Sequence, residues 1–141
     1  MTVPADSARW WLRLAAGDLA GARAIITNPA APPRLAAYLA HQAAEKALKA
    51  AISADGRHPA LSHDLTGLRM SAPDELRDAL PAAVLRPMAS VDVLARYPSR
   101  PAEAIDREAS ELQINAAAEV IGLVTSYLDA TGLDASVLEP V

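Results

Sequence analysis

Alanine is the residue that most limits what this chain can fold into. It makes up about a quarter of the 141 residues, whereas aromatic side chains make up 4% and phenylalanine is absent. Alanine favours helices and lets two backbones approach closely, while strands are rich in Val, Ile, Thr and aromatic residues. The composition therefore predicts an all-α protein with closely packed helices, and it excludes an all-β sandwich.

Length, net charge and cysteine content exclude further classes of protein. We expect one domain over residues 1–141, with a core over about 6–131 and a loosely held tail over 132–141. Cysteine is absent, which excludes disulfides and thiol chemistry, and the net charge of −4 leaves no basic footprint for duplex DNA. No apolar run reaches the roughly 20 residues that cross a bilayer, and the first residues lack signal-peptide features. We therefore expect a cytoplasmic protein without a membrane partner.

Proline and glycine divide the chain into about five expected helices, four long and one short. A loop is expected over 89–101, before the last helix. The expected helices run from near Asp6 to Thr27, from Arg34 to about Ala54, from His63 to about Met70, from about Asp74 onward with a kink or split near Pro81 or Pro87, and from about Pro101 to Thr131, with Gly132 as its terminator.

The last expected helix has two apolar stripes, whereas a helix that covers one side of a core needs only one. Burial on both sides is most simply supplied by a second subunit, so we expect a homodimer through this helix. The alternative is a central helix within the monomer. The stripes are Ile105, Ala109, Leu112, Ala116, Val120, Leu123 and Tyr127, and Ile114, Ala117, Ile121, Val124 and Leu128.

The second expected helix separates polar from small residues. At about 100° per residue, one arc gathers Tyr38, Gln42, Glu45, Lys46 and Lys49, and the opposite side is almost entirely alanine. The alternative to a binding face is a solvated face with helix-stabilising pairs such as Glu45–Lys49.

Four stretches carry a family resemblance. The stretch 38–50 reads Y-L-A-H-Q-A-A-E-K-A-L-K-A, and 63–65 and 96–98 read H-D-L and R-Y-P. These resemble the Y-x-x-Q-Q-A-x-E-K-x-L-K helix and the H-D-L and R-Y-P elements of the HEPN family, with His41 in place of the first Gln. The stretch from Trp11 to Ala22 resembles the family's first helix. The motifs occur in the family's order over about residues 8–130.

This resemblance implies an up-and-down bundle of about five helices that forms a homodimer and is similar to the helical domain of kanamycin nucleotidyltransferase. It also implies a minimal nucleotidyltransferase as partner, in a toxin–antitoxin-like pair, with nucleotide or RNA as ligand. No cofactor is required on this interpretation, and a nucleoside triphosphate is the expected ligand. The expected nucleotide- or partner-binding cleft comprises Tyr38, His41, Gln42, Glu45, Lys46, Lys49, His63, Asp64, Arg96 and Tyr97.

Ribonuclease members of the family place an Arg, a polar residue and then a His within about six positions, near the start of the last long helix. Here Arg96 is followed by Tyr97 and Pro98, and no His follows His63. We therefore expect no ribonuclease activity of the usual kind. One alternative is an RNA endonuclease whose displaced site uses Arg96 or Arg34 and one His, such as His41. Another is a module that only dimerises or binds a partner.

Three smaller hypotheses concern single residues. His41 and Glu45, one turn apart, could hold a metal with His63 or Asp64, but we interpret His41 as a packed side chain and expect no metal. Asp18 lies on the apolar face of the first helix, where a lone carboxylate is costly to bury, so we expect it to pair with Lys46 or Lys49. Arg96 either holds a phosphate, with Tyr97 stacking on a base, or pairs with Glu45 or Asp64.

Overall fold

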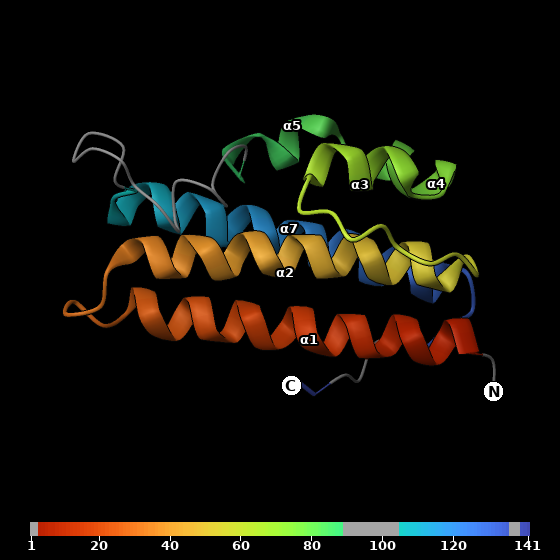
Figure 1. The fold of residues 1–141 in the computed structure, drawn as a ribbon, viewed down its shortest axis with the longest axis horizontal. Coiled ribbons are helices and arrows are strands. Elements are labelled where there is room, and N and C mark those ends of the chain that lie inside the picture. Colours follow the sequence, from red (N-terminus) through yellow and green to blue (C-terminus); the bar gives the residue numbers. More distant parts are fainter. Residues whose placement is uncertain (1–2, 89–104, 136–138) are drawn as a thin grey trace.

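The computed structural model describes residues 3–88, 105–135 and 139–141 (Figure 1). Its described residues form an all-α bundle without strands, as the composition predicts, and no helix among them has both the length and the apolar character needed to span a membrane. The long helices are α1 (Val3–Ile26), α2 (Pro33–Ala54) and α7 (Arg107–Ala130). The short elements are α3 (Leu65–Ser71), α4 (Asp74–Ala79), α5 (Ala82–Leu85) and the 3₁₀ helix η1 (Arg86–Met88).

The chain runs up and down through the bundle. Helices α1 and α2 form an antiparallel hairpin, α3 to α5 return along the top in Figure 1, and α7 runs beside α2 in the same direction. Ser110 Oγ donates to the carbonyl oxygen of Pro33 (3.0 Å), and the Arg107 guanidinium donates to the carbonyl oxygen of Ile26. These bonds join the start of α7 to the turn between α1 and α2.

Local chemistry explains where the helices begin and end. Asp106 Oδ1 accepts from the backbone N–H of Ala109 (2.8 Å), which caps the start of α7. Gly56 follows α2 with φ of 80° and Gly132 follows α7 with φ of 93°, a conformation that favours glycine. The two glycines lie where the sequence predicts the ends of these helices.

One expectation about helices is wrong. The last helix begins at Arg107 rather than Pro101, because Asp106 caps it and Ile105 precedes the cap. The split expected in the segment after Asp74 is confirmed, because this segment is divided into α4, α5 and η1. Pro81 lies at the break between α4 and α5, where its ring and missing N–H prevent a continuous helix. The loop expected over 89–101 lies outside the described residues.

Helix α2 is the central element of the bundle. It packs along both α1 and α7 and also contacts α3. Its alanine side is fully buried, with Ala36, Ala37, Ala40, Ala43, Ala44, Ala47, Ala50 and Ala51 at 0% exposure. Because alanine has only a methyl group, the neighbouring helices can approach closely. Larger side chains from α1, α3, α4 and α7 complete the core, including Leu12, Leu68, Leu76, Val120 and Leu128.

The two stripes of α7 have different environments. The stripe with Ile114, Ala117, Val124 and Leu128 is buried within the chain. In the other stripe Val120 is also buried, but Leu112 remains 58% exposed. Helix α7 contacts α1 and α2 as well as α4, α5 and η1. The monomer thus covers much of both sides of α7, and the homodimer stays a prediction.

The described part of the tail contacts the rest of the chain. The expectation was a loosely held segment over 132–141. Ala135 is buried, and its N–H donates to Asp129 Oδ1 (2.8 Å). Val141 N donates to the carbonyl oxygen of Arg13 (3.1 Å), and a Cβ added to Gly17 would lie 1.7 Å from the Val141 carbonyl oxygen. Glycine at position 17 therefore permits this close approach to α1.

Candidate functional site

The polar arc of α2 is buried rather than solvated. His41 and Glu45 are each 3% exposed, Lys49 is 6% exposed and Gln42 is 9% exposed. The solvated-face alternative is therefore wrong for Gln42, Glu45 and Lys49 of this arc, because α2 is covered on more than one side. We call His41, Gln42, Glu45 and Lys49 the buried polar row. Burial of charged groups is costly unless they are paired and hydrogen-bonded, so their partners decide whether the row is stable.

Glu45 is the centre of this row. Its Oε2 accepts from Lys49 Nζ (3.1 Å), and its Oε1 lies 2.6 Å from His63 Nδ1. Lys49 Nζ also lies 5.5 Å from the centre of the Trp11 ring, a cation–π contact that links the row to α1. Both carboxylate oxygens of Glu45 are thus hydrogen-bonded. Because the side chain of His63 is 53% exposed, the network reaches the surface at this histidine.

Each residue of the H-D-L element has a separate role. His63 reaches back to Glu45, whereas Asp64 Oδ1 accepts from the Thr66 backbone N–H (3.1 Å) and caps α3. Leu65 is 6% exposed and enters the core. A Cβ at Gly67 would lie 2.9 Å from Asp64 Oδ2, so the small residue leaves room for the cap. Asp64, expected in the cleft, therefore acts as a helix cap in this structure.

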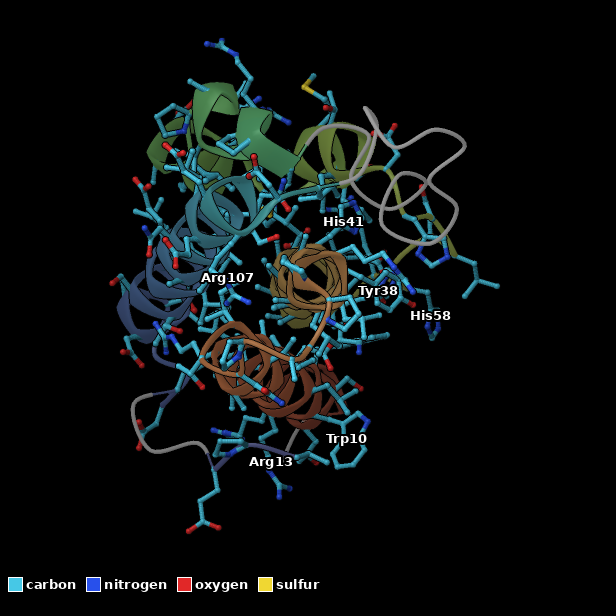
Figure 2. All side chains as sticks on the ribbon, turned by 90° about the vertical axis from the view of Figure 1, so that its left-hand side faces the viewer. Trp10, Arg13, Tyr38, His41, His58 and Arg107 are labelled. Carbon is cyan, nitrogen blue, oxygen red and sulfur yellow. The ribbon has the colours of Figure 1, made fainter. Side chains whose placement is uncertain are left out.

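Lys46 and Tyr38 are less buried than the four residues of the buried polar row. Lys46 Nζ donates to Asp18 Oδ2 at 2.5 Å, and the two side chains are 22% and 20% exposed. This contact is the Asp18 pair that the sequence analysis expects, and it links α1 to α2. Tyr38 is partly buried against the core and lies on the side of α2 opposite α7 (Figure 2).

The structure also places the residues of the alternative hypotheses. His41 leaves α2 in a different direction from Tyr38 (Figure 2), and its ring is almost inaccessible to solvent. Arg34 lies near the start of the same helix and is partly exposed. Arg96 and Tyr97 lie outside the described residues, so their two interpretations stay open. Within the described ranges no group of three or more potential ligands is arranged to hold a metal ion.

Trp11 contributes to the site in a way that the sequence analysis missed. The helical pattern assigns Trp11 to the core face of α1, but its ring also faces the ammonium group of Lys49. The signal available in the sequence is that Trp11 and Lys49 both lie in family-like motifs. Their contact depends on how α1 and α2 pack, which a wheel of either helix does not contain.

Two surface hollows lie away from the buried polar row. A polar one of about 400 Å³ is lined by Asp55, Arg57 and residues 70–75 and 77. Arg57 spans it, with a bond from Nη2 to the Ser71 carbonyl oxygen (2.5 Å). The other hollow lies between α5 and α7 and is lined by Ala83, Val84, Pro87, Leu112, Asn115, Ala116 and Glu119.

Tyr127 on α7 has a raised pKa. Its burial, together with the charges of Glu75 and Asp55, disfavours the ionised phenolate.

The fold and the site define a class of protein: a helical bundle whose central helix carries a buried polar row that meets an H-D-L element. The HEPN domain model matches residues 8–127, and the chain belongs to the HEPN-domain family. No curated protein matches it.

Two solved structures resemble the chain. TT1696 from Thermus thermophilus is 27% identical, with a TM-score of 0.71 over 84% of this chain and 96% of that one. ST0689, described as an archaeal HEPN homologue, is 24% identical, with a TM-score of 0.64 over 91% of this chain and 99% of that one. The second likeness concerns the fold alone.

Proposed function

We propose that this HEPN-domain protein binds a nucleotide where α2 meets the H-D-L element, as the homodimeric partner of a minimal nucleotidyltransferase in a toxin–antitoxin-like pair. The observation that carries the proposal is the bond between buried Glu45 and half-exposed His63. A carboxylate and an ammonium group in the interior are a costly arrangement, which core packing alone does not require. Their connection to the surface through His63 supports a binding role.

The buried polar row offers the chemistry that a nucleotide needs. Gln42 Nε2 is buried and has no hydrogen-bond partner among the described residues, and amide groups can recognise base edges. The imidazole side chain of His63 is half-exposed, and Tyr38 supplies an aromatic ring one turn before Gln42 on α2. Polar groups of this kind beside an aromatic side chain are typical of sites that hold nucleotides.

Thermal unfolding in the presence of ATP tests whether the chain binds a nucleotide. Ligand at a hundred times its dissociation constant adds about 2.7 kcal/mol to the free energy of unfolding, so the melting temperature of the wild-type chain should rise. His58→Gln is the matched control, because His58 is an exposed loop histidine outside the network. His63→Asn should show a smaller rise. If millimolar ATP and GTP leave the melting temperature of the wild-type chain unchanged, nucleotide binding is excluded.

A separate experiment tests the partnership with a nucleotidyltransferase. We expect the product of an adjacent nucleotidyltransferase reading frame to co-elute with this chain in size-exclusion chromatography. Substitution of surface residues near His63, such as Thr66→Arg on the exposed side of α3, should weaken that complex. Absence of any complex at micromolar concentrations would contradict the partnership. Cleavage of RNA by the purified wild-type chain would favour the endonuclease alternative instead.

A further inference from the structure

The geometry points to Glu45 as a positioning residue: we propose that it holds His63 by Nδ1–H, so that Nε2 is the atom that donates a hydrogen bond to a phosphate oxygen of the bound nucleotide. This inference rests on the proposed nucleotide-binding function. It adds the ligand group that is contacted, the atom that contacts it and the residue that orients that atom.

The first step concerns which ring nitrogen carries the proton. Glu45 Oε1 lies 2.6 Å from His63 Nδ1, and Oε2 accepts from Lys49 Nζ at 3.1 Å. An ionised carboxylate can only accept hydrogen bonds, so Nδ1 must be the donor in this contact. The neutral ring of His63 is therefore held as the Nδ1–H tautomer. Its remaining nitrogen, Nε2, carries a lone pair and takes up the next proton.

The second step concerns charge. Among the described residues, the charged group bonded to the ring is Glu45 from α2, and Lys49 compensates its charge. Asp64, the neighbour of His63 along the chain, is engaged at the start of α3, and Lys46 is paired with Asp18. A proton taken from solvent by Nε2 thus gives the Glu45–Lys49–His63 group one net positive charge. That charge lies on the only side chain of the three that is exposed beyond 10%.

The third step concerns the ligand group. A protonated ring whose Nδ1–H is already bonded to Glu45 has one further donor, Nε2–H, and the side chain that carries it is 53% exposed. Charge-assisted hydrogen bonds to phosphate oxygens are stronger than neutral ones, and a chain with a net charge of −4 needs a local cation to hold an anionic phosphate. Phosphate binding and the proton on Nε2 therefore stabilise each other.

Nitrogen NMR of the imidazole rings in the full-length chain tests the role of Glu45 without any ligand. We expect the neutral ring of His63 to be protonated at Nδ1, whereas exposed His58 should favour the ordinary Nε2–H form. In Glu45→Gln, the single amide oxygen goes to Lys49 and the amide NH₂ faces the ring, so the proton should move to Nε2. A predominantly Nε2–H ring of His63 in the wild-type chain would overturn the proposal.

Addition of ligands at constant pH then tests the phosphate contact. ATP and inorganic tripolyphosphate should both shift His63 Nε2 toward its protonated signature, and adenosine should not. His63→Asn keeps a donor for Glu45 at the position of Nδ1 but lacks Nε2, so it should fold normally and bind ATP about tenfold more weakly.

The outcomes separate this inference from the proposed function. If ATP raises the melting temperature while the ring nitrogens of His63 do not respond, the inference fails and nucleotide binding stands. If adenosine alone produces the shift, the contact is to the nucleoside and the phosphate assignment fails. If ATP does not bind at all, both fail. Equal ATP affinity of His63→Asn and the wild-type chain would also overturn the inference.

Discussion

Helices α2 and α7 are similar in length but are buried in different ways. In α2 the alanine side and the buried polar row are both enclosed by the rest of the chain, so that charged atoms of Glu45 and Lys49 lie in the interior. In α7 one stripe is enclosed, but Leu112 on the other remains 58% exposed beside the hollow between α5 and α7. The stability of α2 in the fold therefore depends on the pairing of its buried charges. The stability of α7 depends on apolar packing, which the monomer leaves incomplete at Leu112.

The difference follows from side-chain size. Alanine at close contacts lets α1 and α7 approach the backbone of α2, whereas the polar row is contacted by Trp11 of α1 and by His63 before α3. Helix α7 carries branched and longer side chains, which fill space toward α2 but also project outward. The following experiments can break or sharpen this comparison, in order of decreasing expected effect on stability.

Removal of the Glu45 carboxylate should have the largest effect. Glu45→Ala leaves the Lys49 ammonium group buried without its partner, and loss of one member of a buried pair costs about 3–5 kcal/mol in the free energy of unfolding. Urea unfolding monitored by circular dichroism measures this loss of stability. The matched control on α7 is Glu119→Ala, an exposed residue that should change stability by less than about 0.5 kcal/mol. Similar small losses for both variants would contradict the comparison.

Enlargement of the alanine side should have the next largest effect. Ala47 is fully buried on α2, so Ala47→Leu should overpack the core and cost about 1–3 kcal/mol in the same urea experiment. Ala20→Leu on the exposed side of α1 provides the control and should be nearly neutral. If Ala47→Leu is as stable as the control, close helix packing is not what alanine provides here.

The pair between α1 and α2 should contribute less, because Asp18 and Lys46 are about one-fifth exposed. A double-mutant cycle with Asp18→Asn and Lys46→Met should give a coupling energy of about 1 kcal/mol, and this energy should fall with added salt. Additive effects of the two substitutions would show that the contact is not stabilising. Asp6→Asn, in an exposed pair with Arg9, serves as a reference for a weak ion pair.

The exposed side of α7 should matter least for folding and most for assembly. Leu112→Ser should change the free energy of unfolding by less than about 0.5 kcal/mol, because the side chain is mostly exposed. If the homodimer forms through α7, the same variant should shift the chain from dimer to monomer in multi-angle light scattering. A wild-type monomer at micromolar concentrations would refute the homodimer, and an unaffected dimer would place its interface elsewhere.

Much of the fold could be predicted from local chemistry. The end of α2 at Gly56, the end of α7 at Gly132 and the break at Pro81 follow from backbone conformations that these residue types favour or forbid. The sequence predicts the start of α7 too early, because the helical period continues upstream of Asp106 and a periodic pattern does not show which polar residue will cap the helix.

The site was less predictable than the fold. A helical wheel places Glu45 and Lys49 in one arc, but it gives only the direction of a side chain and not what covers it. The same arc was therefore compatible with a solvated face, and only the packing of α1 and α3 against α2 shows that it is buried. The wheel also places Lys46 in the polar arc, whereas in the structure the ammonium group of Lys46 bonds to Asp18 on α1.

The sequence by itself determined the helical class, the alanine-lined central helix and the order of the family motifs, because helix propensity, periodicity and turn chemistry act between residues close along the chain. Only the tertiary structure decided which polar groups meet. The Glu45–His63 bond joins residues from α2 and from the segment before α3, and the Lys49–Trp11 contact joins α2 to α1. Such contacts depend on how helices cross in space, which local propensities do not specify.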